Sequence, residues 1–185
     1  MAILTLAEVR SLLQVPVGDT SRDTLIGTLI PLVQAGIVDH CRNAFLAPGW
    51  KVEGDTISFT PGTPAYIDDS DSGFVDAGFP SGCDINVHGS GCNDGIYGVT
   101  TVAAGRLTLN AGEQVATELA NEVITITRVV WPKNLKVDAA QLINYYLTKQ
   151  GKLVNSESLP GGYSVDYKKD AEVWSAMNKY RKPFR

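Results

Sequence analysis

The chain has few of the side chains that catalytic sites are built from. Its 185 residues include only two histidines and three cysteines. With only His40 and His88 available, a nucleophilic site of the Ser/His/Asp or Cys/His kind has few ways to form. His40 and Cys41 are adjacent on a predicted helix, where neighbours in sequence do not face each other. The segment Gly89-Ser-Gly91 lacks the spacing of a nucleophile elbow and the lysine of a phosphate loop. We therefore expect no enzyme.

The scarcity of cysteine also limits metal sites and disulfides. Cys83 and Cys92 flank His88, which is an arrangement that metal sites share. If residues 84–88 form a strand, however, Cys83 and His88 point to opposite faces, and no fourth ligand lies nearby. A disulfide between Cys83 and Cys92 is allowed by geometry and disfavoured by a reducing cytosol. Cys41 is most simply a core residue. We expect no metal and no cofactor.

An acidic cluster is the remaining candidate for ion binding. Asp68, Asp69, Asp71 and Asp76 could hold calcium or act as a general acid and base. The cluster lacks the twelve-residue loop with a closing glutamate that calcium sites of the EF-hand type use. A glycosidase pair would also need a sugar cleft, which such short strands seldom build. A solvated loop is the simpler interpretation.

The sequence also lacks targeting signals. Its first residues have neither the cationic start nor the cleavage site of a signal peptide. No apolar run approaches the ~20 residues that span a bilayer. We expect a protein that is made in a cytosol and does not enter a membrane.

Charge is unevenly distributed along the chain. Residues 168–185 hold six Lys and Arg against Asp170 and Glu172, a net charge of +4. Residues 51–131 hold eleven Asp and Glu against three basic residues, a net charge of −8. An acidic body with a basic end favours steering between like subunits or onto an acidic partner. A nucleic-acid-binding domain is usually basic overall, whereas the pI here is about 5.1.

Helical patterns occupy the first part of the chain. Thr5 and Glu8 have the spacing of a capping box, which predicts a helix through about Gln14. A longer helix is predicted to start between Asp19 and Asp23, with Pro31 inside it as a kink or a new start. Its apolar stripe consists of Leu25, Leu29, Leu32, Val33, Ile37, Cys41 and Phe45.

The middle of the chain alternates between apolar and polar residues, as strands do. We predict strands at 55–60, 83–88, 95–102, 106–109 and 122–130. Helical periodicity then resumes at Pro132 and ends before Gly151. Its apolar stripe consists of Leu135, Ala139, Leu142, Ile143, Tyr146 and Leu147. A last helix after Asp170 is expected to pack Trp174 and Met177 on the stripe of the preceding helix that contains Leu142 and Tyr146.

These patterns predict an α+β fold with two domains. Residues 1–50 and 132–185 would form one helical domain, because both segments have helical periods and flank the strands. Residues 51–131 would form an inserted small antiparallel β-barrel or sandwich.

Several motifs occur in a characteristic order. The second predicted helix ends Cys41-Arg-Asn-Ala-Phe45. Ser156-Glu-Ser-Leu159 and Gly162-Tyr-Ser-Val-Asp-Tyr167 follow the third, separated by an extra Pro160-Gly161, and the chain closes with Lys179-Tyr-Arg-Lys182. Through these motifs residues 1–46 and 132–185 resemble the head-tail connector, or adaptor, proteins of long-tailed bacteriophages. In the middle segment, motifs such as Gly73-Phe, Gly78-Phe and Asn93-Asp-Gly are similar to a β module of phage tail and neck proteins.

The resemblance implies a structural virion protein with an α-helical adaptor domain. It would form a ring, a dodecamer of neighbouring adaptor subunits, under the portal protein at the head-tail interface. The ring would join the capsid to a downstream neck or tail protein and let genomic DNA pass without sequence-specific binding. Assembly would take place in the host cytoplasm. The C-terminal segment docks on the portal in this family, so the predicted partner-binding residues are Lys179, Tyr180, Arg181, Lys182, Phe184 and Arg185.

Two other functions remain open. A carbohydrate- or receptor-binding module is suggested by aromatic residues of the β segment, and it requires them on one exposed face. These residues are Trp50, Tyr66, Phe74 and Tyr97. A small hydrolase is the enzyme alternative, and the missing catalytic constellation argues against it.

Overall fold

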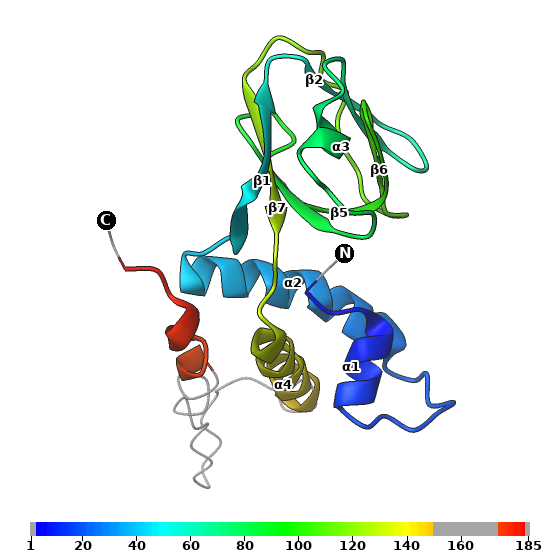
Figure 1. Cartoon of the computed structure of the whole chain (residues 1–185). Coiled ribbons are helices and arrows are strands. Elements are labelled where there is room, and N and C mark those ends of the chain that lie inside the picture. Colours follow the sequence, from blue (N-terminus) through cyan, green and yellow to red (C-terminus); the bar gives the residue numbers. More distant parts are fainter. Residues whose placement is uncertain (1–2, 150–173, 184–185) are drawn as a thin grey trace, which may run out of the picture. The chain divides into compact units, whose positions relative to one another are not determined.

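The computed structural model describes residues 3–149 and 174–183. This part of the chain divides into two compact units (Figure 1). The β unit comprises residues 44–130, and the α unit comprises residues 3–43 together with 131–149 and 174–183. The β unit therefore begins seven residues before the predicted boundary at 51, because its first strand already starts at Leu46.

The predicted fold class is wrong. The main architecture is one seven-stranded antiparallel sheet, and the structure does not show a helical adaptor domain that carries a small barrel or sandwich. The strand order is β1-β7-β4-β5-β6-β3-β2, so the sheet has two ends and is not a closed barrel. The strands are β1 (Leu46–Gly54), β2 (Ile57–Thr60), β3 (Tyr66–Asp69), β4 (Asp84–His88), β5 (Gly95–Ala103), β6 (Arg106–Leu109) and β7 (Ile124–Val129).

Two of these strands, β1 and β3, were absent from the sequence prediction. β1 contains Pro48 and Gly49, which are typical of loops, and its pairing with β7 shifts register between Leu46 and Lys51. β3 ends in two aspartates, which are depleted in strands. In both cases hydrogen bonding to other strands outweighs the low strand preference of these residues. β1 pairs with β7, and β3 pairs with β2 and β6. The alternation of apolar and polar residues within the segment does not reveal such partners.

The sheet surrounds a single hydrophobic core. Side chains from both ends of the strand order contribute to the same cluster, so the sheet must curve around it. The short helix α3 (Gly73–Asp76) adds Phe74, which is completely buried and meets Phe79 edge to face at 6.3 Å. The largest buried core side chains of this unit are Phe59, Phe74, Ile57, Ile67, Ile85, Leu107, Leu109 and Ile124.

A buried carboxylate organises the turn between β3 and α3. Asp69 is 3% exposed and accepts three hydrogen bonds: from the Thr56 hydroxyl at 2.7 Å and from the amides of Asp71 at 3.1 Å and Gly73 at 2.9 Å. Burial raises the pKa of Asp69, but these hydrogen bonds outweigh it and hold the pKa below its usual value. The carboxylate therefore stays charged and satisfies the amides of a tight turn.

The α unit starts with the predicted capping box. In α1 (Leu6–Leu12) the Thr5 side chain accepts from the Glu8 amide, and the Glu8 carboxylate accepts from the Thr5 amide at 2.8 Å. Glu8 also pairs with Lys136 of α4 at 2.7 Å. One glutamate thus both starts α1 and contacts a residue 128 positions away.

Helix α2 (Asp23–Cys41) is the central element of this unit, with Pro31 inside it. Its buried residues are Ile26, Leu29, Ile30, Val33, Ile37 and Cys41, whereas Leu32, which was expected in the stripe, is 63% exposed. By length and composition alone α2 could also cross a membrane, so the prediction that no apolar run comes close to a span was wrong. A soluble core helix meets the same criterion, and the buried face of α2 packs on α1 and α4.

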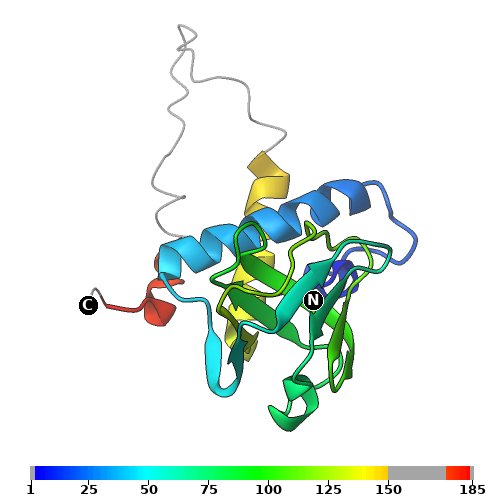
Figure 2. The same cartoon turned by 90° about the horizontal axis from the view of Figure 1, so that it is seen from above.

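Helix α4 (Lys133–Lys149) completes the described helical packing. It begins just after Pro132 and buries Leu135, Ala139, Leu142 and Ile143, in agreement with the predicted stripe. The two views show α4 crossing α2 (Figures 1 and 2).

Residues 44–130 should fold without the rest of the chain, because their core cluster contains no side chain from outside this range. We expect the isolated segment to give a β-type circular dichroism spectrum and one cooperative unfolding transition in urea. An unfolded spectrum would contradict the prediction, since it would mean that the strands need the helices for their core.

Replacing Asp69 with Asn should destabilise the β unit by about 1–3 kcal/mol at pH 7. The carboxylate accepts from three donors, whereas the NH₂ group of asparagine would face one of these donors and leave it without an acceptor. Asp69 has a lowered pKa in the folded state, so its contribution is present above the unfolded value of about 3.9 and is lost as pH falls below it. The difference between wild type and variant in urea unfolding should therefore shrink at acid pH. Asp68→Asn is the matched control, and its effect should be smaller because Asp68 pairs with Arg106 at the surface.

Candidate functional site

Four of the six predicted partner-binding residues, Lys179 to Lys182, belong to a segment that lies on the end of α2. Residues 174–183, called here the C-terminal segment, begin with Trp174, whose ring lies 5.0 Å from that of His40. A Cβ atom on Gly36 would lie only 3.0 Å from Cη2 of Trp174, so the indole occupies the space that glycine leaves on the helix. Trp174 was expected on Leu142 and Tyr146 of α4, but the contacts described for it are with α2.

The centre of this contact is apolar. Met177 and Cys41 are both completely buried, and the Cys41 thiol donates to the Met177 carbonyl at 3.5 Å. Burial raises the pKa of the Cys41 thiol, and the nearby Arg181 offsets this only in part. The thiol is therefore protonated at neutral pH and unreactive while it is covered.

Polar contacts surround this apolar centre. The Lys182 backbone amide donates to the Cys41 carbonyl at 2.9 Å, and Nδ2 of the Asn43 side chain donates to the Tyr180 carbonyl at 3.3 Å. Nε2 of His40 lies 3.0 Å from Oδ1 of Asn178. A carbonyl at the end of α2 that has no partner inside the helix is thus satisfied by the C-terminal segment.

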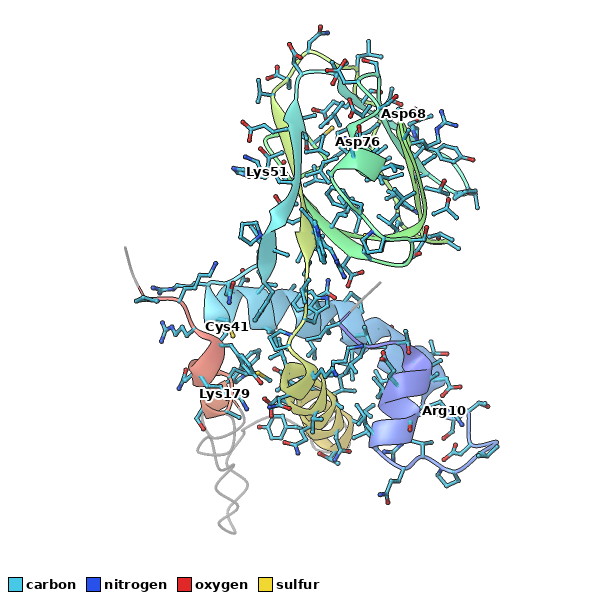
Figure 3. The ribbon with its side chains drawn as sticks, in the orientation of Figure 1. Arg10, Cys41, Lys51, Asp68, Asp76 and Lys179 are labelled. Carbon is cyan, nitrogen blue, oxygen red and sulfur yellow. The ribbon has the colours of Figure 1, made fainter. Side chains whose placement is uncertain are left out.

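Two of the predicted docking residues contact α4. Lys179, which is labelled on the C-terminal segment in Figure 3, pairs with Asp138 at 2.9 Å. The Tyr180 hydroxyl donates to the same carboxylate at 3.3 Å. The hydrogen bond to Asp138 raises the pKa of Lys179, whereas burial is the main cause of the raised pKa of Tyr180. These side chains therefore help to hold the segment on its own chain.

The other predicted residues divide into two groups. Arg181 and Lys182 are exposed next to the C-terminal end of α2, whereas Phe184 and Arg185 lie outside the described residues. The signature at 156–167 lies outside them as well. Cations at this position complement the negative end of the helix dipole, so they have one structural role before any partner is considered.

The residues considered for metal chemistry do not form a cluster. Cys83 is buried and Cys92 exposed, and both are free thiols. His88 lies 3.4 Å from Asp94. Within residues 3–149 and 174–183, no three His, Cys, Asp or Glu side chains are arranged to hold an ion.

The acidic cluster is divided between separate structural roles. Asp68 pairs with Arg106, which also lies 4.6 Å over the Tyr66 ring. Asp69 accepts from the turn that leads to α3, as described above. Asp76 closes α3. The clustered aspartates therefore act mainly on the backbone and on a neighbouring strand.

The aromatic residues considered for receptor binding are largely engaged within the β unit. Phe74 belongs to the core, and the Tyr97 hydroxyl donates to the Asn93 carbonyl at 3.1 Å. Trp50 is 36% exposed, and the Arg128 guanidinium lies 3.6 Å from its ring centroid. Phe74 at least is unavailable to a ligand, which removes one of the four aromatic residues from that alternative.

Sequence comparison with protein-family models and with curated proteins finds no match for this chain.

Sequence analysis identified the segment but not the residues that receive it. Gly36, His40 and Asn43 come from α2 and its C-terminal cap, and Asp138 comes from α4. The sequence contained one signal of this site, which is Gly36. A glycine in the middle of a long apolar helix lowers stability unless another group packs closely against it.

The C-terminal segment should be held mainly by its apolar anchors. Met177→Ala should weaken its packing by about 2–5 kcal/mol, because a fully buried methionine is lost. Cys41 would then become reactive, and its alkylation rate should rise by at least about tenfold. Lys179→Ala and 1 M salt should have much less effect, because that ion pair is half exposed. If 1 M salt alone made Cys41 as reactive as Met177→Ala does, the prediction that the apolar anchors hold the segment would be wrong.

Proposed function

We propose that this protein is a structural virion protein, a head-to-tail adaptor that forms a ring under the portal and joins the capsid to the neck or tail. The observation that carries the proposal is the C-terminal segment. It contains Lys179-Tyr-Arg-Lys182, one of the motifs through which the chain resembles phage adaptors, and Arg181 and Lys182 are exposed beside α2. The proposal does not depend on a helical adaptor fold.

The charge distribution supports this role. All eleven acidic residues and the three basic residues counted for 51–131 lie in the β unit, which therefore carries a net charge of −8. A surface of this sign repels the phosphate backbone, as a ring that DNA passes through without sticking requires. The same charge suits attraction between an acidic surface and the exposed cations of another subunit.

The position of the cations supports portal docking. Lys179 and Tyr180 are engaged with Asp138, so Arg181 and Lys182 are the side chains that a fixed segment presents outward. We assign contact with the portal to Arg181 and Lys182, and with them Phe184 and Arg185. Lys179 and Tyr180 would position the segment.

The double variant Arg181→Ala/Lys182→Ala should weaken binding to the portal protein of the same virus by about tenfold or more at low salt. Because Debye screening reaches ~8 Å near physiological ionic strength, added salt should weaken the wild type more than the variant. Particles assembled with the variant should be filled heads without tails. Arg22→Ala/Lys133→Ala removes two other exposed cations and should leave binding unchanged.

Mass measurement of the wild-type protein with and without the portal tests the function itself. The expected result is a ring that adds to the portal. If the wild type neither forms rings nor binds the portal, the adaptor function is wrong. If the wild type binds the portal and the double variant binds it equally well, the function stands and the assignment of the docking residues is wrong.

A further inference from the structure

The surface beneath the C-terminal segment has the properties of a peptide-binding site. α2 contributes Gly36, whose missing side chain makes room for an indole, and the Cys41 carbonyl, which accepts a backbone amide at the end of the helix. α4 contributes Asp138, which is only 15% exposed and accepts from both a lysine and a tyrosine. The site thus recognises a side chain of defined shape, a backbone group and a pair of polar side chains.

The segment contributes matching anchors over a short stretch. Trp174 fills the space over Gly36, Met177 is buried against Cys41, and Lys179 and Tyr180 reach Asp138. These side-chain anchors fall within seven residues, and the Lys182 amide that donates to the Cys41 carbonyl lies two residues further on, so a short peptide of nine residues contains the whole recognition sequence. The described contacts do not depend on which chain supplies that peptide.

The length of the connection allows the peptide to come from another molecule. Twenty-four residues separate Lys149, at the end of α4, from Trp174. Fully extended, they could reach about 80 Å. Within one chain the docked segment contacts Asp138, which lies only about 17 Å back along α4 from Lys149. The connection is thus longer than docking on the same chain requires.

We propose that this site binds the C-terminal segment of a second copy of this chain, so that neighbouring copies exchange residues 174–183. Exchange of an identical element creates no new interface chemistry, which makes it a low-cost route to assembly. Docking within one chain is favoured in dilute solution by the tether, whose effective concentration is in the millimolar range. Docking between chains becomes the more populated state where the local concentration of copies exceeds that value. The proposal does not depend on the virion role.

The test uses two full-length variants that each lack one half of the interaction. The receiver carries Met177→Asp, which puts a charge where the segment must be buried and leaves the receiving site intact. The donor carries Gly36→Leu, which places a side chain in the space of Trp174 and leaves the segment intact. Leucine is also a better helix former than glycine, so the donor helix should not be weakened.

Alkylation of Cys41 reports whether the receiver site is covered. Mass spectrometry separates the two chains, because the peptide that contains Cys41 also contains position 36. In the receiver alone, Cys41 should react at least about tenfold faster than in the wild type. The donor is then added at about 1 mM, which is the order of the effective concentration of a tethered segment. The alkylation rate of Cys41 in the receiver should return toward the wild-type value. A complex of one receiver and one donor should appear by native mass spectrometry.

Gly27→Leu provides a matched control donor. Gly27 lies on the same helix with nothing near its Cβ position, so this chain keeps its own segment and should protect the receiver much less. Trp174→Ala serves as a second receiver if Met177→Asp lacks its helical circular dichroism. The proposal is wrong if Cys41 of a folded receiver is already protected, stays reactive with the donor, or is protected equally by the Gly27→Leu chain.

Discussion

Antiparallel pairing between β1 and β7 is the constraint on which the two-unit organisation depends. Leu46 is in register with Val129, and the Val130 amide donates to the Phe45 carbonyl at 2.9 Å. The chain therefore enters and leaves the β unit at adjacent positions. As a result, helices that are separated by the whole β unit in sequence can pack together, and Glu8 can meet Lys136. A pairing of such long range has a high loop-closure cost, which only the burial of a complete core can offset.

Inside the β unit, two of the buried polar side chains, Asp69 and Asn93, hold loops. Asp69 accepts two backbone amides and a hydroxyl, and Asn93, which is 2% exposed, exchanges hydrogen bonds with both backbone groups of Ala116. Each of these side chains provides a hydrogen-bond partner for backbone groups of an irregular loop that would otherwise lack one. Asp69, which the sequence suggested for an ion site, thus holds a loop together instead. The acidic surface that remains outside is what supports passage of DNA in the proposed function.

The α unit combines a structural role and a proposed interaction role at one place. The end of α2 needs partners for its carbonyls, and the C-terminal segment provides one of them while covering an apolar surface. Because the buried Met177 is separate from the exposed Arg181 and Lys182, the segment can be fixed and still present charge to a partner. The same separation underlies both the proposed portal contact and the proposed exchange between copies. The first uses the exposed cations, and the second uses the buried anchors.

The sequence by itself determined the local elements. The Thr5 and Glu8 capping box, the stripe of α4 around Leu135 and Ala139, and strands such as β4 and β6 follow from spacing that acts within a few residues. Sequence analysis also singled out the basic C-terminal segment. Only the tertiary structure decided that seven strands form one sheet, that β1 and β3 are strands, and that Gly36 and Asp138 receive Trp174 and Lys179. These are contacts between distant residues, and their energy arises from pairing and burial that no local pattern encodes.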